Sequence, residues 1–198
     1  MYNIPIILGS TRRDRKSSRV ATFITNKLHA TGRVEPQLID LAELNLPIME
    51  ERLRMRKDPP PGLTGFADAV RNADALVVVT PEYNNGYPGV LKNALDYLLP
   101  EYKRKPVGIV TVSSGDFGGV NALAQLRHIF LHMGAIPVPA RLPIQRVQDS
   151  FGEDGSPADP AYHKRADSFI SELLWLTEAV AERKARDSQT EAEGRPSN

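Results

Sequence analysis

The 198-residue chain contains no cysteine. This absence excludes disulfide bonds, thiolate metal sites, iron–sulfur clusters and cysteine nucleophiles. The chain also has almost no net charge: 25 basic and 24 acidic residues leave +1, so a nucleic-acid site would have to be a local basic cluster. The N-terminal apolar run is too short for a membrane span or a normal signal peptide. We therefore expect a cytoplasmic protein that binds neither nucleic acid nor membrane.

What the chain does contain is typical of one globular domain. Hydrophobic residues make up 41% of it and charged residues 25%, which are ordinary values for folded proteins. The length allows a full sheet with helices on both faces. Residues 187–198 are polar and have no apolar anchors. We therefore predict a folded domain over residues 1–186 and a disordered tail over residues 187–198.

The stretch from Leu76 to Leu99 changes character within its length. The run Leu76–Val79 is typical of a strand that is buried on both faces of a parallel sheet. Prolines, glycines and asparagines then predict an ordered loop up to Gly89. From Val90 onward, apolar residues recur at helical spacing. The unit is therefore strand, loop and helix, and loops at the carboxyl ends of strands form the ligand crevice in open α/β sheets.

Two further units of the same kind are predicted. Residues 2–8 and 106–112 are strand candidates, each followed by a polar loop (9–19 and 113–119) and a helix (20–28 and 120–133). The remaining elements are a weaker strand at 34–41, a helix at 63–72, a short strand at 136–139, a helix at 161–184, and long connections at 42–64 and 140–159. This alternation predicts an α/β fold: a flavodoxin-like, doubly wound, five-stranded parallel sheet of order 2-1-3-4-5 with helices on both faces.

The loop after the first strand has the composition of an anion site. It places the hydroxyls of Ser10, Thr11, Ser17 and Ser18 and the guanidinium groups of Arg12 and Arg15 just before or at the start of a helix. A helix N-terminus offers free N–H groups and a favourable dipole to a phosphate, and arginine adds a bidentate fork. The patterns GxxxxGK[ST] and GxGxxG are both missing, which excludes a P-loop and a dinucleotide fingerprint. The alternative is a basic helix start with a serine cap.

The other two loops suit a flat ligand. The second carries Glu82, Tyr83, Asn84, Asn85 and Tyr87 between prolines. Polar and aromatic groups of this kind can hold a heteroaromatic ring with polar edges, although a capped turn with surface tyrosines would explain the same residues. The third loop, SSGDFGG, contains glycines that allow close backbone approach to a ligand, or simply a flexible turn. His128 and His132 fall within a predicted helix, and we assign them no role.

Three segments closely resemble the NADPH-dependent FMN reductase family, which includes quinone, azo-dye and chromate reductases. They are GSTRRDRKSSRVA (Gly9–Ala21), PEYNNGYPGVLKNALDYL (Pro81–Leu98) and GGVNALAQLRHIFLHMGA (Gly118–Ala135). The most specific part is a Pro-Glu-Tyr-Asn turn followed by Pro-Gly and by Leu-Lys-Asn-Ala-x-Asp. The resemblance covers residues 2–139.

This resemblance implies a set of cofactor-binding residues. In the family, the first loop holds the FMN phosphate, the Pro-Glu-Tyr-Asn turn holds the isoalloxazine ring largely through backbone groups, and the third loop lies beside the pyrimidine edge of the ring. The matching residues are Ser10, Arg12, Arg15, Ser17 and Ser18 in the first loop, Pro81, Glu82, Tyr83 and Asn84 in the second, and Ser113, Ser114 and Gly115 in the third. Many relatives have Pro-Gly in place of Arg13 and Asp14, and Gly-Pro in place of Ser17 and Ser18, so the phosphate contacts are expected to differ in detail.

The activity implied by the resemblance is hydride transfer from NADPH or NADH to FMN, followed by electron transfer to a small acceptor such as a quinone, an azo compound, chromate or free flavin. No side chain is assigned as an acid or nucleophile, and no metal is expected. Family members often form dimers or tetramers, so we expect a homodimer or homotetramer with Leu44–Pro61 as the contact. Two alternatives stay open. One is a flavodoxin-type electron carrier, which the loop arginines and the net charge of +1 disfavour; the other is a flavin-binding sensor or scaffold without turnover.

Overall fold

The computed structural model describes residues 1–193, and its centre is a parallel sheet of order β2-β1-β3-β4-β5. The predicted strand order is confirmed. The strands are β1 (Tyr2–Leu8), β2 (Val34–Asp40), β3 (Leu76–Pro81), β4 (Pro106–Val112) and β5 (Ile136–Pro137), with a further strand, β6 (Leu142–Ile144), paired to β4. Every assigned strand pair is parallel, as expected for strands that alternate with helices.

The central strands are buried on both faces because they are apolar at successive positions. In β3, Val77 and Val79 pack into one hydrophobic cluster and Leu76 and Val78 into the other, since neighbouring side chains of a strand point to opposite faces. All four of these side chains are fully buried. The uniform apolar run that predicted a strand buried on both faces therefore contributes side chains to both hydrophobic clusters.

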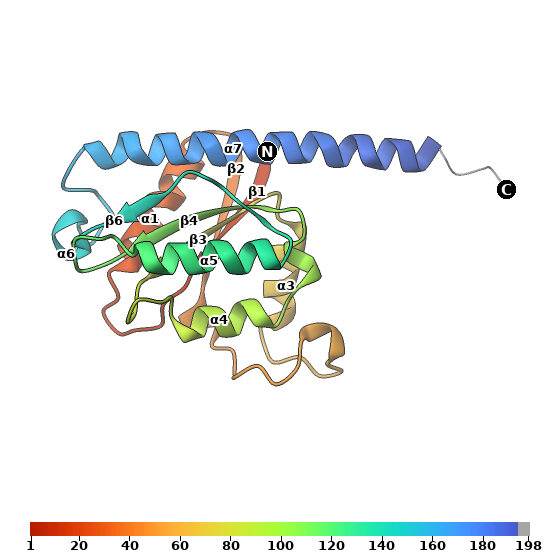
Figure 1. The fold of residues 1–198 in the computed structure, drawn as a ribbon, viewed down its shortest axis with the longest axis horizontal. Coiled ribbons are helices and arrows are strands. Elements are labelled where there is room, and N and C mark those ends of the chain that lie inside the picture. The colour runs from red at the N-terminus through yellow and green to blue at the C-terminus, as the bar shows by residue number, and fades with distance from the viewer. Residues whose placement is uncertain (194–198) are drawn as a thin grey trace.

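Two layers of helices cover the sheet (Figure 1). The cluster on one face contains buried residues of α1 (Ser17–His29) and α7 (Ala161–Glu193), and the cluster on the other contains those of α3 (Leu63–Asn72), α4 (Gly89–Asp96) and α5 (Val120–His132). The remaining short elements are α2 (Leu41–Leu44), η1 (Leu53–Met55), η2 (Pro100–Tyr102) and α6 (Val147–Ser150). No helix within the described residues is long and apolar enough to cross a bilayer.

The edge of the sheet beyond β4 differs from the prediction. The expected strand at 136–139 is only two residues long, and the expected connection at 140–159 contains β6 and α6. The chain leaves the sheet between the two strands, where Arg127 donates hydrogen bonds to the carbonyl oxygens of Val138 (3.2 Å) and Pro139 (2.7 Å). It then returns so that Ile144 lies beside Val112 at the carboxyl end of β4. This return brings a fourth loop to that end of the sheet.

The last helix is longer than its apolar spacing indicated. It continues to Glu193 and runs past the rest of the domain (Figure 1), whereas the sequence predicted an end near Lys184 and a tail from Asp187. Ion pairs between Arg183 and Asp187 and between Arg186 and Glu182 join successive turns and stabilise a polar helix without apolar anchors. The last part of the predicted tail, 194–198, lies outside the described residues.

Candidate functional site

The loops that follow β1, β3 and β4 meet at one end of the sheet (Figure 1). Residues of these loops line a cleft of about 400 Å³. Most of the predicted site residues line it: Ser10, Arg12, Arg15 and Ser17 from the first loop, Pro81, Glu82 and Tyr83 from the second, and Ser113 and Ser114 from the third. Three predicted residues do not line it. Ser18 donates through Oγ to the Arg15 carbonyl (2.8 Å), Asn84 lies at an exposed turn, and Gly115 is an exposed part of the third loop.

The start of α1 is built to receive an anion. Ser17, its first residue, is 3% exposed, and neither its Oγ nor the Nε of Arg15 has a hydrogen-bond partner among the described residues. The helix has no side-chain N-cap and no acidic residue in its first turn, so its N–H groups and dipole stay uncompensated by the protein. Buried donors without partners are costly. A phosphate bound here would satisfy them, and the residues present therefore fit the phosphate end of FMN.

The positive charges of the first loop are not equivalent. Arg15 forms an ion pair with Asp40, whose other carboxylate oxygen accepts the Ala42 N–H (2.9 Å) and caps α2. Three further cations that line the cleft make no ion pair with any described residue; they are Arg12, Arg13 and Lys16. Arg15 is thus held in place with its charge partly compensated, while the other three remain available to a ligand.

The second loop is a tight hairpin. Tyr83 and Gly86 exchange two backbone hydrogen bonds of 2.7 and 3.0 Å, and the residues between them, Asn84 and Asn85, have φ values of 50° and 62°. A two-residue loop with left-handed backbone at both positions is the arrangement that Asn and Gly favour. The asparagines that marked this segment as a turn are therefore required by its backbone.

Side chains from two other segments hold this hairpin. The Tyr83 hydroxyl lies 2.8 Å from Ser10 Oγ in the first loop. One carboxylate oxygen of Glu82 accepts the N–H groups of Asn121 (2.9 Å) and Ala122 (3.1 Å), and so caps the N-terminus of α5. Gln125 on the same helix donates to the Asn85 carbonyl (2.8 Å). Glu82 is therefore engaged with α5, which leaves the main chain of the turn and the tyrosine ring to meet a ligand.

The third loop forms the opposite wall. Ser113 Oγ donates to the Gly115 carbonyl (2.7 Å) and accepts the Gly118 N–H (3.1 Å), which closes the loop on itself. Gly118 has φ 64°, and a Cβ there would lie 2.6 Å from Pro143, so no larger residue fits. Asp116 forms an ion pair with Arg146, whose hydrogen bond lowers the pKa of the carboxyl. This ion pair joins the loop that follows β4 to the segment that follows β6.

The sequence did not predict the contribution of α6 to the cleft. Val147 and Gln148, which follow β6, line the cleft, and Gln148 donates to the Ser114 carbonyl (3.3 Å). No local signal marked them, because they lie in a stretch that lacks clear periodicity. Arg13, Asp14, Lys16 and Val112 also line the cleft; the first three lie inside the basic loop already singled out.

Several residues around the cleft have strained backbone. Asp14, Asn84, Asn85 and Arg146 all have φ values between 41° and 62° without being glycine. Such conformations are uncommon for residues with a side chain and cluster at functional sites. Of these four residues only Asp14 lines the cleft, and two further non-glycine residues with positive φ, Asn45 and Arg104, lie outside these loops.

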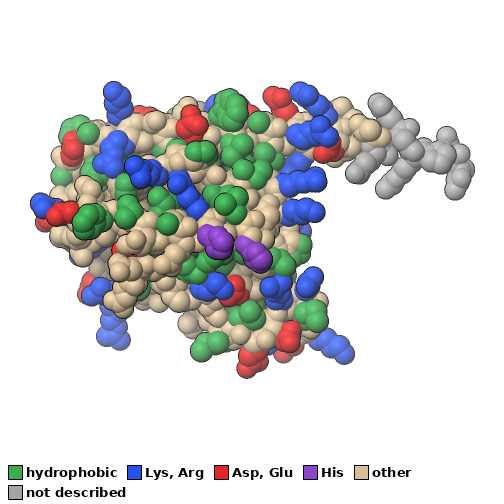
Figure 2. Space-filling model, in the orientation of Figure 1, with side chains coloured by type: hydrophobic (Ala, Val, Ile, Leu, Met, Phe, Trp, Pro, Cys, Tyr) green, Lys and Arg blue, Asp and Glu red, His purple; other side chains and the backbone are tan. Residues whose placement is uncertain are grey.

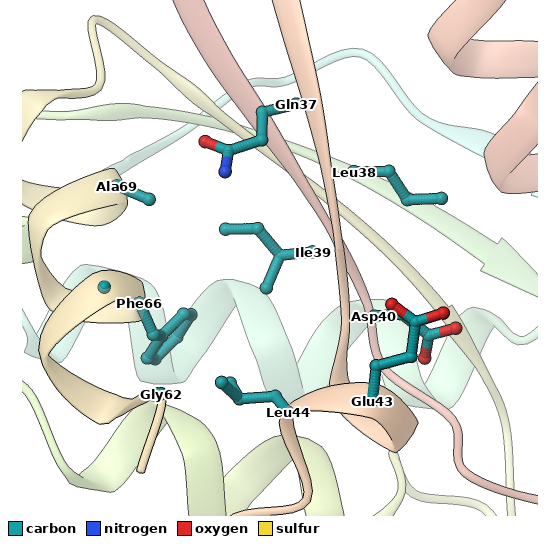
Figure 3. A pocket seen from close by; sticks show the side chains of 10 residues that line it. Gln37, Leu38, Ile39, Asp40, Glu43, Leu44, Gly62, Phe66 and Ala69 are labelled. Atoms are coloured by element: carbon teal, nitrogen blue, oxygen red, sulfur yellow. The ribbon is translucent and has the colours of Figure 1, made fainter.

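Two other cavities lie elsewhere and contain none of the predicted site residues. One, of about 270 Å³, lies beside β2, where Ile39, Leu44 and Phe66 form an apolar wall and the carboxylates of Asp40 and Glu43 lie at one end (Figure 3). The other, of about 450 Å³, lies between α4 and α5 and is lined in part by His128 and His132. Two histidines lie next to each other on the face shown in Figure 2, among basic and apolar side chains.

Comparison with known proteins identifies a family and several relatives. Residues 2–149 match the family model described as NADPH-dependent FMN reductase. The chain is 31% identical over 146 residues to a quinone reductase of Pseudomonas putida, which covers 70% of this chain and 76% of that protein. It is also 31% identical over 184 residues to an FMN-dependent NADPH-azoreductase of Staphylococcus aureus, covering 85% and 92%. Among solved structures, FerB, a flavoenzyme NAD(P)H:(acceptor) oxidoreductase from Paracoccus denitrificans, superposes with a TM-score of 0.75 at 26% identity, covering 90% of this chain and 98% of that one.

Proposed function

Because the chain belongs to the NADPH-dependent FMN reductase family, we propose that its cleft holds FMN and that the enzyme uses NADPH or NADH to reduce a small acceptor such as a quinone or an azo compound. The observation that carries this proposal is the meeting of three separately predicted loops around one cleft. When bound, FMN supplies the chemistry: it takes hydride from a nicotinamide and passes electrons on. The protein supplies binding, orientation and electrostatics.

The phosphate end of FMN would lie at the start of α1. The unpartnered Ser17 Oγ and Arg15 Nε are donors for phosphate oxygens, and Ser10 Oγ lies in the same loop. Arg12 adds a guanidinium that makes no ion pair with a described residue. Hydrogen bonds from charged donors to a phosphate are the strong ones, so this end would contribute most of the specificity for FMN over riboflavin.

The ring end would lie between the second and third loops. Pro81, Glu82 and Tyr83 line the cleft from the second loop, and Ser113 and Ser114 line it from the third. Tyr83 is fixed by its bond to Ser10, so the same contact joins the two ends of the site. Neither Gly115 nor Ser18 lines the cleft. Gly115 would shape the backbone of the third loop, and Ser18 would hold the first loop through its hydrogen bond to the Arg15 carbonyl.

No side chain is proposed as an acid or a nucleophile. Glu82, the carboxylate nearest in sequence to the ring wall, is occupied by the N–H groups of α5. The role of the protein is therefore to hold the cofactor, exclude water from one face of it and leave the other face open to the two substrates. Substrate choice would then depend on the cleft entrance.

Self-association is part of this proposal. The segment Leu44–Pro61 exposes Ile48 (85% exposed) and Met55 (65% exposed), apolar side chains that a contact between subunits would bury. We propose this segment as the contact of a homodimer or homotetramer. Sedimentation velocity on the wild type and on an Ile48→Asp, Met55→Asp double variant tests the contact, because a smaller species is expected only for the variant.

The central experiment is spectroscopic. Purified protein reconstituted with FMN should show the absorption bands of bound oxidised flavin, and these should bleach on anaerobic addition of NADPH. Sustained NADPH oxidation in the presence of a quinone should follow. Bleaching without turnover would favour a sensor or scaffold, and reduction only by a protein donor would favour an electron carrier of the flavodoxin type.

A further inference from the structure

The first loop carries more positive charge than the FMN phosphate requires. Arg12, Arg13, Arg15 and Lys16 all line the cleft, and only Arg15 has an ion-pair partner among the described residues. A phosphomonoester carries a charge of about −1.5 to −2 near neutral pH, which two cations balance. Three uncommitted cations therefore leave at least one for a second anion.

The cleft has room for one ligand. About 400 Å³ lies near the lower end of the range for sites that hold a single small molecule, about 300–1,000 Å³. With FMN inside, a nicotinamide nucleotide must lie across the entrance, and its phosphates can reach only cations at the rim. The cations that FMN does not use could therefore bind a phosphate of the nicotinamide nucleotide.

Arg13 is a cleft-lining cation that is neither assigned to the FMN phosphate nor next to the start of α1. Lys16 directly precedes Ser17, the start of α1. The main-chain N–H of Arg12 faces Ser10 Oγ (3.5 Å), which is itself bonded to Tyr83 inside the cleft. Arg13, by contrast, lies at an exposed turn whose next residue has a left-handed backbone with φ 53°.

The backbone conformation at Asp14 lowers the stability of the turn relative to a glycine at the same position. A residue with φ 53° is most easily a glycine, and the chain instead has Asp14 there. Asp14 also lines the cleft, so its carboxylate opposes an approaching phosphate. At the cleft entrance Arg13 would attract a phosphate and Asp14 would repel it. Together these two side chains could discriminate between anions.

We propose that Arg13 binds the additional ribose phosphate that distinguishes NADPH from NADH, and that Asp14 limits this preference. The inference rests on the proposed function, because it assumes a nicotinamide nucleotide at the cleft entrance. The guanidinium matches a phosphomonoester through two parallel N–H···O bonds. NADH lacks this group and gains nothing from Arg13.

The test compares Arg13→Gln with wild type, using the FMN-loaded protein. Adenosine 2′,5′-bisphosphate and adenosine 5′-monophosphate are titrated calorimetrically, since they differ only in the 2′-phosphate. The variant should bind the bisphosphate about 10- to 100-fold more weakly, the range for one charged hydrogen bond. Affinity for the monophosphate and for FMN should stay within about twofold. In turnover, kcat/KM should fall by the same factor for NADPH and remain unchanged for NADH.

Two further variants sharpen the result. Arg183→Gln removes one positive charge from the exposed far end of α7 and controls for net charge; it should change neither ligand. Asp14→Asn should shift the bisphosphate affinity in the opposite direction to Arg13→Gln. Equal weakening of both adenosine nucleotides, no weakening of either, or loss of FMN affinity in Arg13→Gln would overturn the assignment. The titrations need no turnover, so an inactive wild type would count against the proposed function while Arg13 remains tested.

Discussion

The hairpin at Asn84 offers a direct test of whether the second loop is a flavin platform or an ordinary turn. Asn84 is exposed and has φ 50°, and its side chain makes no hydrogen bond with the described residues, unlike Asn85, whose Oδ1 accepts from Asn121 (3.4 Å). Replacing Asn84 with valine therefore changes the backbone preference and almost nothing else. A β-branched residue is strongly disfavoured in the left-handed region.

The size of the effect follows from the backbone. Holding a residue with a branched side chain in this conformation costs about 1–2 kcal/mol. If the whole cost falls on folding, Tm of the FMN-free protein drops by about 2–8 °C, because 1 kcal/mol corresponds to about 2–4 °C at this chain length. If the free turn relaxes, the same cost appears on binding, as an FMN affinity weaker by about 5- to 30-fold.

We expect the larger share on binding. The Tyr83–Gly86 bonds and the contacts of Asn121 and Gln125 hold Gly86, Tyr83 and Asn85, whereas Asn84 at the exposed tip is free to change its backbone conformation in the free protein. Bound FMN would require the observed conformation. Thermal unfolding of the FMN-free protein and quenching of FMN fluorescence measure the two shares separately.

The matched control is Asn84→Gly, which accepts the left-handed backbone and should preserve both Tm and FMN affinity to within experimental error. A valine variant with lower Tm but unchanged FMN affinity would refute the reasoning, since the hairpin would then be a structural turn. Equal effects of valine and glycine would show that the asparagine side chain, and not the backbone, carries the role.

Three other predictions concern the cofactor, the kinetics and the pH dependence of stability. Arg12→Ala should weaken FMN binding by about 1.5–3 kcal/mol, the range for hydrogen bonds to charged groups; an unchanged titration would remove Arg12 from the phosphate site. The cleft of about 400 Å³ holds one ligand, so the electron donor and the acceptor should occupy its entrance in turn. Initial rates over a grid of NADPH and quinone concentrations should then give parallel double-reciprocal lines. Intersecting lines together with a ternary complex would contradict a shared site. Burial, with a smaller contribution from Lys184, lowers the pKa of Lys105 from 10.5 to about 8. Between these two pH values Lys105 is protonated in the unfolded chain but largely neutral in the folded protein. The free energy of unfolding should therefore rise with pH in this range, by up to about 1.4 kcal/mol per pH unit. Denaturant titrations of wild type and Lys105→Met from pH 7.5 to 9.5 check this, and an equal rise in both would mean that another group is responsible.

The amino-acid sequence determined most of the elements, and their alternation predicted the order of the five main strands. Runs such as Leu76–Val79 specify strands buried on both faces through their own composition, and the apolar spacing of α1, α3 and α5 specifies helices that need one buried face. These signals are local, so they can be seen without knowing what the segment packs against. The turn residues Asn84 and Asn85 belong to the same class, because their own backbone preference matches the hairpin.

The tertiary structure alone decided which side chains of the loops remain free for a ligand. Arg15 is paired with Asp40, 25 positions away, and Glu82 caps a helix that begins 38 residues later. Strand β6 has only three residues with a proline in the middle, and it forms because β4 offers an open edge at its carboxyl end. Contacts of this kind depend on how the sheet brings distant segments together. The periodicity and composition of a single segment do not predict such contacts. For that reason the sequence did not predict that Val147 and Gln148 line the cleft.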